Sequence, residues 1–101
     1  MTELAAKEAR CVGVVDGGMF VTEAGETVVL ARVRVPRMGL PGGAVLRMLV
    51  QRVVQDRDVQ LEAVGRDHAG HVIAEVWVDG RNVNDYMLQC VTECGYGHER
   101  G

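Results

Sequence analysis

The sequence contains few aromatic residues: one tryptophan, two tyrosines and one phenylalanine make up 4% of its 101 residues. Hydrophobic residues nevertheless account for 48% of the chain, so valine, leucine, isoleucine, methionine and alanine have to fill the core. A chain of this length suits one domain of ordinary size. Charged residues make up 25%, as in an ordinary soluble protein, which excludes a disordered composition.

Long apolar runs are also missing, since none approaches the roughly 20 residues that a membrane-spanning helix needs. The first eight residues, M-T-E-L-A-A-K-E, are polar and lack the apolar region of a secretory signal. Three cysteines is an odd count, which argues against a disulfide framework in a secreted protein. We therefore expect a cytoplasmic protein that makes no membrane contact.

Acidic residues exceed basic ones, and the formal net charge is −3. This balance argues against a general nucleic-acid binder, which usually carries a basic face. The charge is unevenly distributed, because residues 32–66 hold seven arginines and three acids, whereas the rest of the chain holds four basic and eleven acidic residues. The basic middle of the chain is either a surface for anions or part of an ordinary mixed surface.

Periodicity and turn residues predict five strands and two helices. The strands are expected at residues 11–15, 20–22, 27–35, 59–64 and 72–78, and the helices at residues 44–54 and 82–91. This order fits a mainly β protein with helices (α+β): a five-stranded OB-type β-barrel with one helix between the third and fourth strands and a C-terminal helix. We expect a polar lead-in at residues 1–9, the barrel domain at 10–93 and a flexible tail at 94–101.

Four segments resemble motifs of the staphylococcal nuclease family. V-V-D-G-G-M at residues 14–19 resembles that family's turn V-x-D-G-D-T, and residues 28–37 resemble its strand V-R-L-x-G-I-D-x-P-E. D-H-A-G-H at residues 67–71 resembles D-x-Y-G-R. The closest match is V-W-V-D-G-R-N-V-N at residues 76–84, which resembles V-x-x-D-G-x-x-V-N. The resemblance covers about residues 11–91 and implies the same OB-type barrel.

The resemblance also implies where an active site would lie. In that family, carboxylates of D-G-D and I-D-x-P-E hold calcium, the glutamate after the proline positions or deprotonates water, and two arginines hold the phosphate. This chain has Gly18, Arg34, Arg37, Val29 and His71 at those five positions. The family's first turn acid is retained as Asp16, where its role is mostly in the turn.

The five replacements remove the chemistry that the family uses. Calcium needs several oxygen ligands, and glycine offers no side-chain oxygen. Arginine is a permanent cation, so it repels a metal ion and cannot accept a proton near neutral pH. We therefore expect no enzyme activity, no catalytic residue, no cofactor and no bound metal.

Three functions remain open for such a barrel. The first is a non-catalytic binding or regulatory module that contacts an unknown protein partner, and a homodimer is compatible with its apolar helix faces. The second is metal-independent binding of single-stranded nucleic acid or a phosphate anion through residues 32–66. In this case Arg34, Arg37 and His71 would cluster where the resembling family binds phosphate. The alternative for those three residues is that they are solvated side chains. An active metal-dependent nuclease is the least favoured function.

A zinc site is a weaker alternative. Cys90, Cys94 and His98 are spaced i, i+4, i+8 and would share one face of a continuous helix, with His68 or His71 as a possible fourth ligand. Gly95 and Gly97 interrupt such a helix, so the simpler interpretation is a core Cys90 and a free Cys94.

Two single residues also have a functional and a structural interpretation. Cys11 could act as a nucleophile with a histidine, but its apolar strand favours a core position. Trp77 could stack on a base, as in other OB-type barrels, or simply pack against the sheet.

Overall fold

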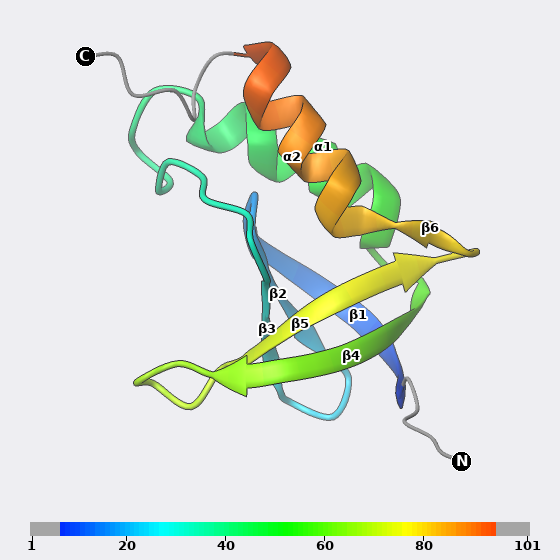
Figure 1. Cartoon of the computed structure of the whole chain (residues 1–101). Coiled ribbons are helices and arrows are strands. Elements are labelled where there is room, and N and C mark those ends of the chain that lie inside the picture. The colour runs from blue at the N-terminus through cyan, green and yellow to red at the C-terminus, as the bar shows by residue number, and fades with distance from the viewer. Residues whose placement is uncertain (1–6, 95–101) are drawn as a thin grey trace.

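The chain forms a closed five-stranded β-barrel with two helices packed together at one end of it (Figure 1). This computed structural model describes residues 7–94. The strands are β1 (Lys7–Asp16), β2 (Met19–Thr22), β3 (Thr27–Leu30), β4 (Asp58–Arg66), β5 (Val72–Val78) and the short β6 (Arg81–Asn82); the helices are α1 (Gly43–Val54) and α2 (Val83–Cys94). The expected OB-type barrel, with one helix between the third and fourth strands and another at the C-terminal end, is confirmed.

The barrel closes where two strands far apart in sequence run parallel. Neighbouring strands follow the order β3-β2-β1-β4-β5, and each of these pairs is antiparallel. β3 then pairs with β5 in parallel, with Val28 opposite Val72 and Leu30 opposite Ala74. The two-residue β6 only extends the end of β5, where Val78 lies opposite Arg81. Closure leaves few unpaired strand edges for aggregation.

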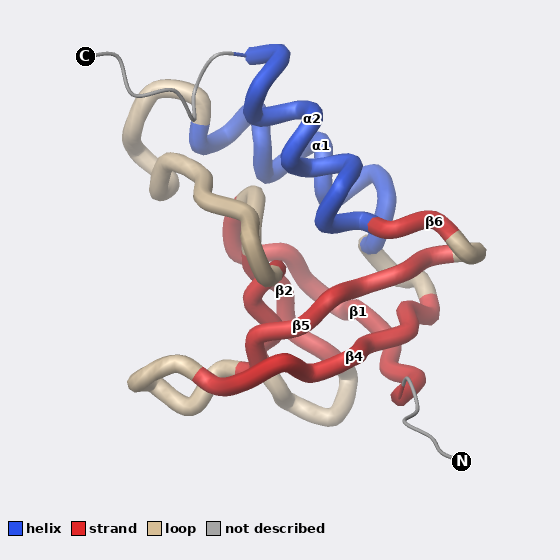
Figure 2. The backbone as a smooth tube through the Cα atoms, in the orientation of Figure 1, coloured by secondary structure: helices blue, strands red, loops and turns tan. Residues whose placement is uncertain are grey.

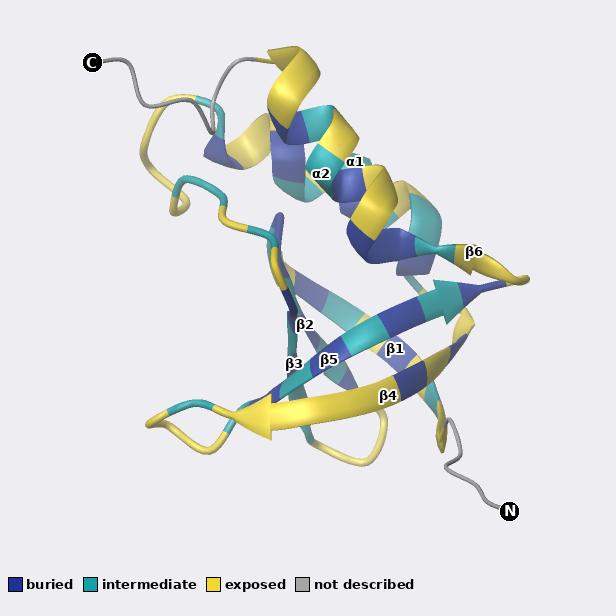
Figure 3. Ribbon diagram, viewed as in Figure 1, coloured by how far each residue is buried: buried dark blue, intermediate teal, exposed yellow. Residues whose placement is uncertain are grey.

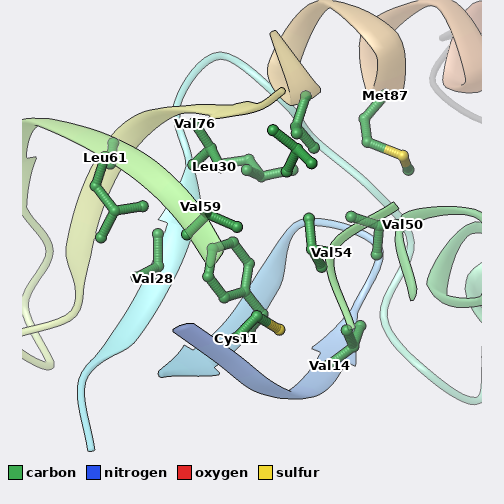
Figure 4. Close-up of a cluster of buried hydrophobic side chains, with 14 of the residues drawn as sticks. Cys11, Val14, Val28, Leu30, Val50, Val54, Val59, Leu61, Val76 and Met87 are labelled. Atoms are coloured by element: carbon green, nitrogen blue, oxygen red, sulfur yellow. The ribbon is translucent and has the colours of Figure 1, made fainter. Parts of the chain in front are cut away.

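The core lies inside the barrel and between the barrel and the helices. Along β5 buried and half-buried residues alternate, as expected when one face of a strand points inward (Figure 3). The single phenylalanine, Phe20, is fully buried and belongs to the core cluster. Figure 4 shows Cys11, Val28 and Val59 of the barrel in this cluster, together with Val54 of α1. Many aliphatic side chains therefore point inward, and their summed van der Waals contacts make up for the scarcity of aromatic residues.

Two boundaries differ from the expectation. β1 begins at Lys7, because Lys7 pairs with Leu61 and Ala9 with Val59, so residues 7–9 belong to the barrel and not to the polar lead-in. α2 extends to Cys94, the first residue of the expected tail. The polar residues at the start of β1 show no apolar alternation, so the sequence does not indicate a strand there. Only their pairing with β4 identifies them as strand residues. The rest of the lead-in and tail, residues 1–6 and 95–101, lies outside the described residues.

The third strand is much shorter than its sequence pattern indicates. β3 ends at Leu30, and Arg32 has a left-handed backbone with φ of 70°, which takes the chain out of the sheet. Residues 31–42 then run as a loop to α1 (Figure 2). Ala31 is buried and Arg34 exposed, so the alternation persists beyond the strand. It arises from packing of the loop on the barrel end rather than from strand pairing.

One buried polar side chain joins the barrel end to α2. Asn84 is 0% exposed, and its side-chain amide donates to the carbonyl oxygens of Ala31 at 2.9 Å and Ala74 at 3.0 Å. Its Oδ1 accepts the N–H of Val76 at 2.8 Å. The N–H of Ala31 still donates to the carbonyl of Ala74 at 2.9 Å, so in a continued parallel ladder the N–H of Val76 would bond directly to the carbonyl of Ala31. The Asn84 amide lies between these two groups and bridges them instead.

In the part of the chain that the structure describes, no helix has both the length and the apolar composition needed to cross a bilayer.

Replacing Asn84 with alanine tests this closure. Asn84→Ala leaves the N–H of Val76 and the carbonyl of Ala31 without their partners in a buried place, and we expect a loss of about 3 kcal/mol of unfolding free energy. Urea denaturation followed by the fluorescence of the single tryptophan measures it. The exposed Thr92 of the same helix is the matched control, and Thr92→Ala should change the unfolding free energy by less than about 0.5 kcal/mol. Equal effects of the two substitutions would contradict this role of Asn84.

Candidate functional site

The turn between β1 and β2 is packed tightly against α1. The side-chain Oδ1 of Asp16 accepts the N–H of Gly18 at 2.8 Å, which is an Asx-type closure of the turn. The carbonyl of Gly18 in turn accepts the N–H of Leu30 at 2.8 Å. A Cβ on Gly17 would lie 2.8 Å from the Cβ of Leu46 in α1. Asp16 is therefore engaged in shaping the turn.

The loop after β3 lies beside this turn. A Cβ on Gly18 would lie 3.7 Å from Cγ2 of Val35 and 3.9 Å from the carbonyl oxygen of Val33. Arg34, between these two half-buried valines, is exposed, and Arg37 is exposed as well. The structure therefore brings three of the predicted site positions, Gly18, Arg34 and Arg37, to one end of the barrel.

The loop is held against the start of α1 by its backbone. The carbonyl of Arg37 accepts the N–H of Leu40 at 3.0 Å. A Cβ on Gly43, the first residue of α1, would collide with the same carbonyl oxygen of Arg37. Gly42 precedes the helix with φ of 87°, a conformation that favours glycine. The Gly-Gly pair is thus required for the loop to approach the helix this closely.

Val29 lies on the outer face of the barrel, among apolar neighbours. It is half-buried, with Met19 of β2 opposite it on one side and Ile73 of β5 on the other. Where the family resemblance implies a phosphate-binding arginine, the surface is therefore apolar.

His71 is held within its own hairpin. Its Nδ1 lies 3.0 Å from Oδ2 of Asp67, and its backbone N–H donates to Oδ1 of Asp67 at 2.9 Å. The backbone hydrogen bond from His71, assisted by its ring and opposed by desolvation, keeps the pKa of Asp67 below its usual value. The hairpin lies at the barrel end away from the helices (Figure 1), so His71 is paired with Asp67 while Arg34 and Arg37 follow the opposite end of β3.

At the positions where the resemblance would imply a metal, the residues do not fit calcium. Of the two ligand positions that the resemblance assigns, Gly18 has no side-chain oxygen and Arg34 is a cation. The nearby carboxylate of Asp16 already accepts a backbone N–H. Among residues 7–94, no three histidine, cysteine, aspartate or glutamate side chains gather as a metal site would require. No step of a mechanism can be derived through calcium here.

The weaker candidates are found in separate places. Cys90 is half-buried against the core, Cys94 is exposed at the last residue of α2, and His98 lies outside the described residues. Cys11 is fully buried, and burial raises the pKa of its thiol, which makes it a poor nucleophile. Trp77 is half-buried on the outer side of β5, opposite Gln60 of β4 and Asn82 of β6.

An ion-pair cluster that the sequence did not indicate lies beside Asn84. The guanidinium of Arg32 donates to both carboxylate oxygens of Glu75, at 2.7 and 2.8 Å, and to Asp85 at 3.0 Å. Asn82 donates to Glu75 at 3.1 Å and accepts the N–H of Asp85 at 2.7 Å, capping α2. The alternation at residues 31–35 suggested a cationic strand face for Arg32. Its left-handed backbone instead turns it toward β5 and α2, and no sequence signal marked that conformation.

Neither a protein-family model nor a curated protein matches this chain. What the site can do therefore has to be argued from its own geometry.

The tight turn gives a steric prediction. Gly17→Ala would place a Cβ 2.8 Å from Leu46 and 3.2 Å from Val35, and we expect a loss of about 1–3 kcal/mol of stability. Gly18→Ala in the same turn makes only ordinary contacts of 3.7–3.9 Å, and is the matched control. Thermal unfolding of both variants compares them. A Gly18→Ala variant as unstable as Gly17→Ala would show that backbone conformation, and not space, determines the effect.

The Arg32–Glu75 pair gives a pH prediction. Hydrogen bonding to Arg32, supported by Asn82 and opposed by desolvation, holds the pKa of Glu75 below its usual value of 4.5. A lowered pKa in the folded state means that the pair stabilises the protein above pH 4.5 and that this stabilisation is lost as pH falls through the folded-state pKa. Glu75→Gln should therefore be less stable than the unmodified protein at pH 7, by about 1 kcal/mol, with the difference disappearing in acid. Unfolding curves between pH 7 and pH 3 test this, and a difference independent of pH would contradict it.

Proposed function

We propose that this protein is a non-catalytic barrel of the staphylococcal nuclease type that acts as a binding or regulatory module through contacts with another protein. The observation that carries the proposal is a group of exposed apolar side chains at the start of α1 and in the loop before it, where the N–H of Gly43 donates to the carbonyl of Leu40 at 3.0 Å. The group consists of Met38, Leu40, Val45 and Met48, which are 44–52% exposed, and we call it the α1 apolar surface. Clustered exposed apolar side chains with polar residues around them are typical of protein interaction sites.

The charge around this surface favours a particular kind of partner. Residues 27–55 contain no acidic residue, and Arg34 and Arg37 are exposed next to Met38. A partner segment with apolar side chains flanked by aspartate or glutamate would complement both the apolar surface and the arginines. We therefore propose an acidic, amphipathic segment of another protein as the occupant.

The same arrangement supports the absence of nuclease chemistry. The proposed relationship places Gly18, Arg34 and Arg37 where two metal ligands and a base would be needed, and Val29 and His71 where two arginines would hold phosphate. With Asp16 engaged in its turn, the site offers one carboxylate and several cations. A cytoplasmic location is part of the proposal and is supported by free thiols at Cys11, Cys90 and Cys94.

Affinity capture with matched variants tests the proposal. Met48→Glu places a negative charge within the α1 apolar surface, whereas Val64→Glu makes the same change at an apolar residue of β4 that is 61% exposed. We expect a partner with an acidic amphipathic segment to be retained by the unmodified protein and by Val64→Glu, and its recovery to fall at least tenfold with Met48→Glu.

Three results would overturn the proposal. The first is that Met48→Glu and Val64→Glu retain the same proteins equally. The second is cleavage of single- or double-stranded DNA with calcium that EDTA abolishes. Steeply salt-dependent binding of a labelled single strand, weakened by Arg34→Gln, would replace the proposal with the nucleic-acid alternative.

A further inference from the structure

A second surface lies between the two helices and the end of β5, and it shares no residue with the α1 apolar surface. It is a cleft of about 490 Å³ lined by residues of the C-terminal half of α1, the turn between β5 and β6, and the first turns of α2. Figure 1 shows where these segments lie in the fold. Three arginines from different elements line it: Arg52 of α1, Arg57 after α1, and Arg81 of β6. We call it the arginine cleft.

Most of the positive charge in the arginine cleft is uncompensated. Within residues 7–94, Arg52 and Arg81 form no ion pair, and Arg57 reaches Asp79 only at 3.9 Å between two well-exposed side chains. The other acid at the cleft, Asp85, is held by Arg32 at 3.0 Å. A single exposed ion pair at this distance contributes little free energy, so it does not hold Arg57 in place. The cationic groups of the cleft therefore remain available to a ligand.

The rest of the lining is suited to a small organic molecule. Val53, Val78 and Val83 supply apolar contacts, and Tyr86 and Gln89 supply polar groups. Burial, followed by the neighbouring Cys90, raises the pKa of Tyr86, so its hydroxyl stays protonated at neutral pH and can donate a hydrogen bond. Arg52 and Arg81 line the same cleft as Tyr86.

We propose that the arginine cleft binds a small organic anion, with a phosphate or carboxylate group held between Arg52 and Arg81 and an apolar part against Tyr86 and the valines. Guanidinium groups match the geometry of both oxyanions, and charge-assisted hydrogen bonds of this kind are among the stronger ones. The volume lies within the range of small-molecule pockets, about 300–1,000 Å³. This inference does not depend on the proposed function, since Arg57, Arg81 and α2 take no part in the α1 apolar surface.

Titration with three anions tests the proposal. Sodium phosphate, adenosine monophosphate and citrate are added to the protein at constant ionic strength, and amide chemical shifts are followed by NMR. We expect saturable shifts at residues of the cleft, with tighter binding of adenosine monophosphate assigning a phosphate ester and tighter binding of citrate assigning a carboxylate. Arg81→Gln should weaken the tighter of the two at least tenfold, because it removes one charge-assisted contact.

Arg66→Gln is the matched control, because it removes the same charge from an exposed position at the end of β4, outside the cleft. The anion affinity of this variant should equal that of the unmodified protein, and Arg52→Gln should behave like Arg81→Gln. Equal weakening by Arg66→Gln and Arg81→Gln would show general charge attraction and overturn the proposal. So would non-saturable shifts with all three anions, even if the capture experiment succeeded.

Discussion

The buried side-chain amide of Asn84 is the interaction on which the rest of this structure depends. Where β3 leaves the sheet after Leu30, the N–H of Val76 and the carbonyl of Ala31 would lose their partners inside the protein, and an unsatisfied buried group is costly. Asn84 pairs with both and adds a second donor to the carbonyl of Ala74, so one side chain closes the barrel end and fixes the start of α2. The Arg32–Glu75–Asp85 cluster forms on the outer side of the same junction. The arginine cleft borders it through Asn82 and Asp85.

At this end of the barrel, the residues that hold the fold together are different from the charged residues on the surface. The β1–β2 turn, the loop after β3 and the start of α1 contact one another through backbone groups and small residues, as the Gly17–Leu46 and Gly43–Arg37 approaches illustrate. Such contacts involve no charged side chain, so the fold does not determine which charges the exposed positions of Arg34 and Arg37 carry. Function therefore has to be argued from the site itself and not from the fold.

Helix α1 links the two surfaces that carry the proposals. Its inward residues Leu46, Val50 and Val54 belong to the core, which fixes the helix against the barrel. Its outward side presents Val45 and Met48 to the α1 apolar surface and, one turn later, Arg52 to the arginine cleft. The apolar part suits a protein segment and the cationic cleft suits a small anion, because the first needs contact area and the second needs convergent donors.

The sequence by itself determined the number, order and type of the main elements, because apolar alternation, helical periodicity and glycine turns act locally. It was enough to place β5 at residues 72–78 and to place α1 within one residue of its observed start. The tertiary structure alone decided the rest. Residues 7–9 are strand because β4 pairs with them, and β3 ends early because Arg32 adopts a left-handed backbone. His71 is held by Asp67 instead of facing Arg34, and three arginines separated along the chain converge on one cleft. These outcomes depend on contacts between segments that are distant in the sequence, and local residue patterns do not predict such contacts.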